Sequence, residues 1–535
     1  MPNSENSPPS SGADVPVRAG RPRPAAPNAE KSQIAGSSRR GLTEAALVCL
    51  SLALLIASAA WWFFQQGYTL YYGDAQSHLN LSRSVIDSRT PGYDQLGTVW
   101  LPVLHLICLP LVANNRLWSS GLAGTIPVAL CFVIAGSCFY LAAKDVYRSS
   151  LAAVVVVSCF ALNPNILYLA SIPMTEVVFL AGLAAMLLAL IQFRRSQTKV
   201  PIILGIIASW SMSLTRYDGW FLIPFASLYF ALFARNRRWI VLIAFAASAS
   251  LAPLYWIGHN WWETGNPLDF YNGPYSAIAI QGAHSYPGYH DWTLAAGYYA
   301  KAGQLCAGWF LIAIGAAGMI FAVIKKTLSP ILFLMLTPVF YIWSIHSSGT
   351  PIFLPQLQSR GYYNSRYGIA VVALAAFAAG AIVLALPTAY KKWAALLPLL
   401  SLAPWLLHPT PGNWICWKES QVNSVSRRAW TNAGTDFFRN HYSPGEGILT
   451  PSASGDLAGI FCRKGIPLRD TINVGNGPAW FANTRPDLVH QALWAVSQAG
   501  DPLANALSHD QSQVYSIASE IQVKGAPPLQ IYRRK

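Results

Sequence analysis

Long runs of apolar residues recur along this chain, as in the stretch "ALVCLSLALLIASAAWWFF". A run of about 20 such residues crosses the hydrocarbon core of a bilayer as a helix, so these runs predict a polytopic α-helical membrane protein. We expect about eleven transmembrane helices, some of them short, at residues 42–66, 118–143, 150–168, 176–193, 201–216, 219–234, 238–258, 303–324, 328–346, 368–389 and 392–408.

The composition agrees with this class. Only 11% of the residues are charged and 53% are hydrophobic, with a mean hydropathy of +0.34, whereas about a quarter of the residues of a soluble protein are charged. Many of the 20 Trp and 24 Tyr lie beside the ends of the expected spans, as in "WWFFQQGYTLYY". Amphipathic rings prefer the membrane interface, so their placement supports spans over a soluble core.

The net charge of +15 does not indicate a nucleic-acid partner, because the cations are not gathered in one soluble domain. Many form short clusters between apolar runs, which is how charge sets membrane topology. Placing these clusters in the cytoplasm puts the N-terminus inside and the C-terminus outside. The clusters are Arg39-Arg40, Lys144 with Arg148, Arg194-Arg195 with Lys199, Arg235 with Arg237-Arg238, Lys325-Lys326 and Lys391-Lys392.

Three regions follow from this pattern. Residues 1–41 are rich in Pro, Ser, Ala and Arg, which predicts a disordered cytoplasmic tail. Residues 42–408 form the transmembrane domain, whose first external loop covers 67–117. Residues 409–535 contain turn residues and alternating patches, which indicate a small external α/β domain. Its two cysteines, Cys416 and Cys462, can form a disulfide in an oxidising compartment, and the sequence leaves this open.

The first external loop has the most ionisable chemistry. Residues 74–88 lack Pro and Gly and predict an amphipathic helix lying at the external surface, with Asp74 and His78 on one face. One interpretation is a surface connector with solvated charges. We favour a function for Asp74, because a carboxylate this close to a span is costly. The pair can also ligate a divalent metal, although two ligands make a weak metal signature.

Further ionisable residues lie at the external ends of later spans. Arg216 and Asp218 occur in "TRYDGW", and Arg366 in "NSRYG". Arg beside Tyr suits a phosphate, because the guanidinium offers a planar fork of donors. The alternatives are snorkelling arginines and an Arg/Asp pair that neutralises itself. Glu176 begins a span, where a helix cap is the favoured role. Secondary phosphate candidates are Lys301 and Arg360.

The loop "WWETGNPLDFYNGPYSA" combines aromatic faces with polar side chains. Stacking on a ring and hydrogen bonds to hydroxyls are the usual contacts of a sugar, which makes Trp262, Asp269 and Tyr271 candidates for sugar or acceptor contacts. The same composition is also typical of an interfacial aromatic belt.

The order of these motifs resembles a known family. The stretch "GDAQSHLNLSRSVIDSRTPGYDQLGTVWLPVLH", followed by "PMTE" and "TRYDGW", is similar to the GT-C superfamily of integral-membrane glycosyltransferases. The nearest branch contains protein O-mannosyltransferases and the aminoarabinose transferase of lipid A. The resemblance covers about residues 42–400 and points to a bacterial set of such proteins, hence to the bacterial inner membrane.

The resemblance implies transfer of a hexosyl or pentosyl group from a polyprenyl-phosphate carrier to an acceptor on the external face, the acceptor being a glycan, lipid or protein hydroxyl. Asp74 falls where the family has its catalytic carboxylate, which acts as general base. Arg366 and Tyr367 fall near late-loop phosphate contacts, with Tyr363, Arg360 and Arg216 as further donor-binding candidates. No cofactor is certain, and a divalent metal remains open.

Two departures and one alternative qualify this expectation. Gly73 and Ala75 flank Asp74, so the adjacent Asp-Glu pair of protein O-mannosyltransferases is absent, which puts a protein acceptor in doubt. No inserted repeat domain of their kind is visible either. A transporter or flippase of a lipid-linked saccharide is the alternative. Transporters place ionisable groups near the bilayer midplane, whereas here these groups lie at span ends.

Overall fold

The computed structural model describes residues 27–281, 286–358, 360–452, 454–476, 485–486, 489, 491–509 and 513–535, with side chains from residue 41 onward. The described residues from 48 onward form one compact unit, and those before residue 48 belong to another. Helix α1 (Pro27–Gln65) begins inside the segment expected to be a disordered tail, because no proline follows Pro27 to stop the helix. The rest of that expected tail, 1–26, lies outside the described residues.

The membrane helices agree with the expected spans in position. In the described part of the chain, six helices are long and apolar enough to cross a membrane, or eight if two bent pairs each count as one span. The six are α1, α5 (Leu122–Tyr147), α8 (Thr175–Ser196), α11 (Arg238–Thr264), α16 (Leu328–Ser347) and α17 (Ile369–Ala385) with the preceding turn η2 (Ser365–Gly368). The chain is therefore an integral membrane protein.

The remaining expected spans are shorter or bent. Helices α6 (Ser150–Ala161) and α7 (Pro164–Ala170) meet at 68°, and α14 (Trp292–Ala307) and α15 (Trp309–Ile324) meet at 107°. Residues 292–302, expected in an external loop, thus belong to a helix. Three shorter apolar helices occupy the other positions: α9 (Lys199–Ser213), α10 (Asp218–Phe233) and α18 (Leu397–Leu407).

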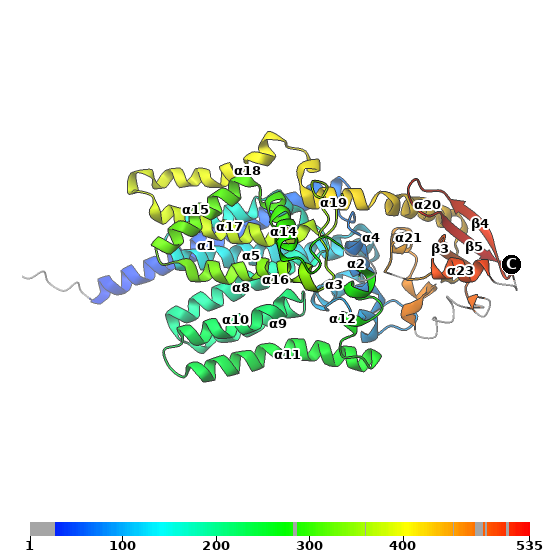
Figure 1. Ribbon diagram of the computed structural model, residues 1–535, viewed down its shortest axis with the longest axis horizontal. Helices are drawn as coiled ribbons and strands as arrows, with labels where there is room; N and C mark the ends of the chain where they lie inside the picture. Colours follow the sequence, from blue (N-terminus) through cyan, green and yellow to red (C-terminus); the bar gives the residue numbers. More distant parts are fainter. Residues whose placement is uncertain are drawn as a thin grey trace, which may run out of the picture. The chain divides into compact units, whose positions relative to one another are not determined.

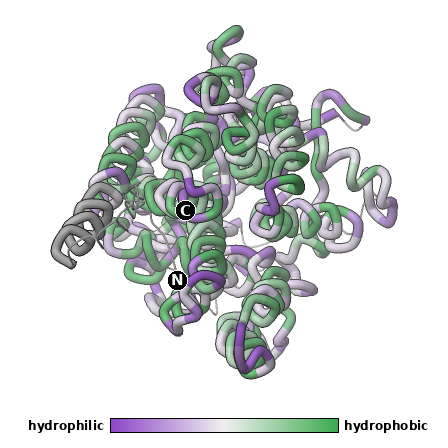
Figure 2. The backbone as a smooth tube through the Cα atoms, turned by 90° about the vertical axis from the view of Figure 1, so that its left-hand side faces the viewer, coloured by the Kyte–Doolittle hydropathy of each residue, from purple (hydrophilic) through white to green (hydrophobic). Residues whose placement is uncertain are grey.

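Burial separates central from peripheral helices. The apolar windows of α8 and α17 are 83% and 78% buried, whereas those of α1 and α11 are 17% and 22% buried. A helix that is apolar on its exposed side faces lipid, so α1 and α11 line the periphery. Figure 2, which looks along the helices, shows hydrophobic residues in most of them. Figure 1 shows α8, α10 and α11 running side by side.

The first loop folds into four short helices: α2 (Gly73–Ser84), η1 (Tyr93–Leu96), α3 (Val103–Val112) and α4 (Asn115–Ser120). The expected surface position of α2 is wrong, since nine of its twelve residues are buried. Its polar side chains bond to the C-terminal region instead of water: Ser77 donates to Ser454 and Asn80 to Ala458. The helix lies between the membrane bundle and the C-terminal region.

The C-terminal region is α/β, as expected. Its sheet has the order β2-β1-β3-β5-β4, with β1 parallel to β2 and β3, and β5 antiparallel to β3 and β4. The strands are β1 (Ile448–Leu449), β2 (Thr471–Ile472), β3 (Trp494–Gln498), β4 (Tyr515–Ile521) and β5 (Leu529–Arg534). The helices are α19 (Ile415–Asn423), α20 (Val425–His441), α21 (Ala458–Lys464) and α23 (Pro502–Ser508), which follow each other into this region in Figure 1.

The cysteines of this region are not joined. Cys416 and Cys462 are both free and buried. The Cys416 sulfur lies 3.9 Å from the sulfur of Cys306, while Cys462 contacts the carbonyl of Trp118. The two thiols therefore pack against different segments, and burial raises the pKa of the Cys462 thiol to about 12.

Short connecting elements complete the chain. Several helices begin at a side-chain cap that accepts hydrogen bonds from free backbone N–H groups, which fixes where they start. These caps are Asn114, Ser149, Asn163, Asp291 and Asp501. The connecting elements are α12 (Asp269–Asn272), α13 (Ala277–Gln281), η3 (Thr388–Leu396), η4 (Pro411–Asn413), η5 (Leu468–Asp470) and η6 (Val474–Asn476).

Candidate active site

Helix beginnings from distant parts of the chain meet at one place. Asp74 lies in the first turn of α2, Glu176 in that of α8 and Asp218 in that of α10. A carboxylate is stabilised at a helix N-terminus by the partial positive charge of its unpaired N–H groups. The sequence therefore places three acids where the helices themselves favour negative charge.

Two glycines permit the close packing that forms this place. A Cβ on Gly219 would lie 2.6 Å from the backbone nitrogen of Ser213, so only glycine fits the tight passage from α9 to α10. A Cβ on Gly368 would lie 2.4 Å from the carbonyl oxygen of Ala302, where η2 packs against α14. These contacts position Asp218 and Arg366 respectively.

Arg366 is the centre of the arrangement. Its Nε donates to Glu176 Oε1 at 2.8 Å, and one terminal nitrogen donates to Asp74 Oδ2 at 2.7 Å. The other terminal nitrogen donates to Glu419 Oε1 at 3.1 Å. The guanidinium also stacks 5.0 Å from the ring centre of Tyr72. Each of its nitrogens thus meets a different carboxylate.

A second arginine extends the network inward. Arg216 lies 3.2 Å from Glu176 Oε1 and 3.3 Å from Asp218 Oδ1. Its guanidinium is 4.9 Å from the ring centre of Tyr367, which stacks on Tyr341 at 4.8 Å. Tyr341 in turn donates to Asp218 Oδ2 at 2.8 Å. The Arg/Asp pair does not merely neutralise itself, because both members bond to further residues.

Glu419 is the member that sequence reasoning missed. It lies on α19, beyond the last expected span, and its Oε2 accepts from the backbone nitrogen of Ser365 at 2.7 Å and from the Ser365 hydroxyl. Burial raises the pKa of Glu419, while Arg366 and the bonds from Ser365 lower it. Its one sequence signal is scarcity, since the chain has only 22 acidic residues.

The four carboxylates, which we call the carboxylate cluster (Asp74, Glu176, Asp218 and Glu419), differ in exposure. The side chain of Asp74 is 40% exposed, whereas those of the other three are 1–2% exposed. With Arg366 and Arg216, the cluster has four negative and two positive formal charges. Asp74 is its reachable member.

His78 points to a different neighbourhood from Asp74, although both lie on α2. Its Nδ1 is 2.9 Å from Nε2 of His105, and its ring packs 4.3 Å from Trp100. Burial lowers the pKa of His78 to about 3, with Arg366 and Arg216 adding to the effect. Burial also lowers the pKa of His105. The imidazoles are therefore neutral near pH 7.

The Asp74/His78 pair does not fit a metal site. Asp74 faces Arg366 and His78 faces His105. Among the described residues, no group of three or more His, Cys, Asp or Glu side chains is placed to hold an ion. We derive no step through a metal.

The remaining phosphate candidates lie at different depths. Tyr367 belongs to the stacked tyrosines beside Arg216, while Tyr363 is more exposed. Asp74 and Arg366 both lie within electrostatic range of the Tyr363 phenol, whose pKa burial raises. Arg360 lines a cavity of about 510 Å³ with residues 355–358, and Lys301 donates to Gln304.

The expected sugar contacts lie together beside the first loop. Trp262 packs 6.1 Å from Tyr93, and Asp269 accepts from the Thr98 hydroxyl at 2.6 Å. Trp262 and Tyr271 are exposed. The ring of Phe270, between the two candidates of its own helix, stacks on Tyr217 at 4.9 Å. This group therefore borders the segment that holds Arg216 without joining the carboxylate cluster.

Comparison with known proteins gives a likeness of fold. No protein-family model and no curated protein matches the sequence. The crystal structure of ArnT from Cupriavidus metallidurans bound to undecaprenyl phosphate is similar, with a TM-score of 0.56 and 12% identity over 89% of this chain and 97% of that one. The apo oligosaccharyltransferase of Archaeoglobus fulgidus has a TM-score of 0.48 and 14% identity over 85% and 69%.

At 12% identity the likeness to ArnT is one of fold, and it agrees with the fold that the sequence resemblance implied.

Proposed function

We propose that this protein is a glycosyltransferase that moves a hexosyl or pentosyl group from a polyprenyl-phosphate carrier to an acceptor hydroxyl, with Asp74 as general base. One observation carries the proposal: Asp74 is the exposed member of a buried carboxylate cluster, and Arg366 fixes one of its oxygens at 2.7 Å. The likeness to a fold that holds undecaprenyl phosphate in ArnT supports the class of carrier.

In this reaction the acceptor hydroxyl donates its hydrogen bond to Asp74. Arg366 donates a hydrogen bond to Oδ2 of Asp74, so Oδ1 is the oxygen that accepts the hydrogen bond of the acceptor hydroxyl. As the proton moves to Asp74, the acceptor oxygen attacks the anomeric carbon in line. The bond from that carbon to the phosphate oxygen breaks, and the carrier phosphate leaves with the electron pair. The configuration at the anomeric carbon is inverted.

The structure changes the role that we propose for Arg366. Its three nitrogens are committed to carboxylates, so it acts mainly by orienting Asp74 and by balancing buried negative charge. We assign the leaving phosphate to the more exposed Tyr363 and Arg360, while the Arg216 guanidinium, which lies against the Tyr367 ring, adds positive charge deeper in the site. Donors aimed at developing charge are a large source of catalysis.

The sidedness follows the basic clusters. We propose eleven spans, a cytoplasmic N-terminus, and a bacterial inner membrane with the site and residues 409–535 on the external face. Trp262, Asp269 and Tyr271 are proposed as acceptor or sugar contacts at the rim of the site. The acceptor is a glycan, lipid or protein hydroxyl.

The location of the charges supports a transferase over a transporter. Glu176, Asp218 and Arg366 all lie at or just before the first turns of α8, α10 and α17. Transporters use ionisable groups near the bilayer midplane on broken helices. A cluster at helix ends meets substrates at the membrane surface.

The test is mass spectrometry of lipids and glycans from cells that carry the wild-type protein, the Asp74→Asn variant or no protein. We expect the variant and the deletion to lose the same sugar-bearing species and to accumulate the same lipid-linked donor. Asp94→Asn, an exposed acid of the same loop, is the matched control. If Asp74→Asn cells match the wild type while the protein is present in the membrane, the proposal is wrong.

A further inference from the structure

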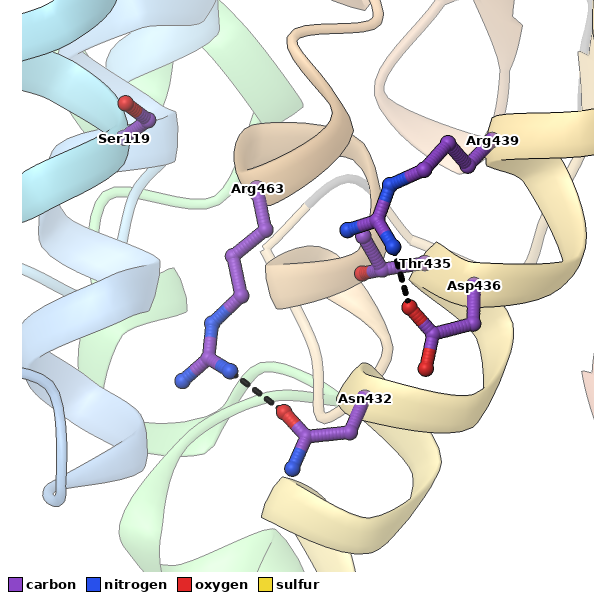
Figure 3. Close-up of a pocket in the computed structure, with 6 residues that line it drawn as sticks. All are labelled: Ser119, Asn432, Thr435, Asp436, Arg439 and Arg463. Atoms are coloured by element: carbon purple, nitrogen blue, oxygen red, sulfur yellow. Dashed lines mark hydrogen bonds and ion pairs between the residues drawn. The ribbon is translucent and has the colours of Figure 1, made fainter.

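A polar pocket lies outside the carboxylate cluster, between the first loop and the C-terminal region. It has a volume of about 500 Å³, a size typical of small-molecule sites. Figure 3 shows its six lining residues, which come from α4, α20 and α21: Ser119, Asn432, Thr435, Asp436, Arg439 and Arg463.

One face of α20 forms the floor. Asn432, Thr435, Asp436 and Arg439 are spaced i, i+3, i+4 and i+7, so they point to the same side of the helix. Arg463 approaches from α21 and donates to Asn432 Oδ1 at 2.5 Å, while Ser119 lies opposite on α4 (Figure 3). The walls thus offer guanidinium, hydroxyl and amide groups, together with the carboxylate of Asp436.

Two details indicate that the pocket is suited to a ligand. Thr435 is 95% buried, and its hydroxyl oxygen has no hydrogen-bond partner in the described part of the chain. An unpaired buried hydroxyl is costly unless a bound group satisfies it. The Arg439–Asp436 pair at 2.7 Å is exposed on both sides, and such surface pairs are weak. Arg439 can therefore exchange its partner for a ligand anion.

One arginine of α20 lies near both the start of α2 and the pocket. Arg427, five residues before Asn432, lies against the start of α2: a Cβ on Gly73, next to Asp74, would be 3.4 Å from its Nε. Burial lowers the pKa of Arg427. The negative charges of Asp456 and Asp74 raise this pKa, and the positive charges of Arg463 and Arg428 lower it further. The charges of both Asp74 and the pocket arginine Arg463 therefore act on Arg427.

We propose that this pocket binds a phosphate group carried by a sugar of the acceptor, with Arg463 and Arg439 holding the phosphate and Ser119, Thr435 and Asn432 the neighbouring hydroxyls. Planar guanidinium forks match phosphate oxygens. The pocket residue Ser119 lies three residues before the start of span α5, so a headgroup at the membrane surface can reach the pocket. The identification of the ligand as acceptor rests on the proposed function.

The test measures binding to the full-length protein in detergent, with glucose monophosphate as the soluble probe and glucose as the neutral one. We expect glucose monophosphate to bind more tightly than glucose, and Arg463→Ala to weaken its binding at least tenfold. Thr435→Val should weaken it severalfold. Lys524→Ala removes an exposed cation of the same region and should change nothing. If glucose binds as tightly as glucose monophosphate, or if Arg463→Ala binds glucose monophosphate as tightly as the wild type does, the proposal is overturned.

A second arm identifies the source of the phosphate. Vesicles of phosphatidylcholine, with or without phosphatidylinositol monophosphate, replace the soluble probe. Binding that needs the phosphorylated lipid and Arg463 assigns the pocket to a lipid headgroup, whereas binding of the soluble probe alone assigns it to a free phosphorylated glycan. Binding of neither overturns the proposal. Because no turnover is measured, Asp74→Asn protein should bind as the wild type does, so failure of the pocket and failure of the transfer reaction are seen separately.

Discussion

The carboxylate cluster and the pocket beside it use the same residue type in opposite ways. Arg366 in the cluster is 11% exposed and meets three carboxylates, whereas Arg439 in the pocket is 62% exposed and meets one. A guanidinium whose nitrogens are all paired holds its partners in place. One that is paired once, in water, remains available to a ligand. The number of paired nitrogens and their burial separate an arginine that orients from one that binds.

The largest expected effect is on the exposed member of the cluster, the proposed general base. Asp74→Asn keeps the shape of the side chain but removes the base, so transfer should fall by about 10²–10⁴-fold. Stability should change by less than about 1 kcal/mol, because this ion pair is partly exposed. Initial rates in reconstituted vesicles and thermal unfolding measure the two quantities. If the variant were destabilised enough to explain its loss of transfer by unfolding, Asp74 would have a structural role.

The next effect concerns the orienting arginine. Arg366→Met leaves Glu176 and Glu419 buried without their common partner, which should destabilise the protein by about 3–5 kcal/mol. Thermal unfolding in detergent checks this value. Arg366→Lys keeps the charge but cannot span three carboxylates, so we expect an intermediate loss. A fully stable Arg366→Met protein would contradict the account of the cluster as a closed network.

The pH dependence of stability tests whether water reaches the buried imidazole of His78. The pKa of His78 is lowered to about 3, so the folded protein keeps this imidazole neutral while the unfolded chain binds a proton below about pH 6.5. Its contribution to stability is therefore complete above that pH and is lost as the pH falls, by about 1.4 kcal/mol per pH unit. His78→Gln should show a shallower loss of unfolding temperature on acidification. If the unfolding temperatures of the variant and the wild type fall in parallel on acidification, water reaches His78 in the folded protein and the prediction is wrong.

The smallest effect is expected in the pocket. Arg463→Met removes an exposed arginine whose main partner is Asn432, so stability should stay within about 0.5 kcal/mol of the wild type. The difference in stability loss between Arg463→Met and Arg366→Met, measured in the same assay, shows how much an arginine contributes when it pairs with several carboxylates. A loss as large as that of Arg366→Met would erase the distinction between the two regions.

Some of this arrangement could be predicted from the sequence. The apolar runs located the membrane helices, and the position of Asp74 just past the first span singled out a residue that belongs to the carboxylate cluster, because both signals are local. The same local reasoning failed for α2: its polar face indicated water, but the C-terminal region covers it. Which residues Arg366 and Glu176 bond to, and that Glu419 joins them, depends on contacts between segments far apart in the chain, which no local pattern contains.

Glu419 gives the site an order of assembly. The ribosome makes Ser365 and Arg366 before Glu419, which lies 54 residues after Ser365. Throughout that interval the start of α17 lacks the carboxylate that holds Ser365, even though α2, α8 and α10 have already been synthesised. Helix α19 therefore adds the last of the four carboxylates and the third carboxylate partner of Arg366. Translation that stops before α19 would leave a membrane-inserted chain in which Ser365 and Arg366 lack the Glu419 carboxylate.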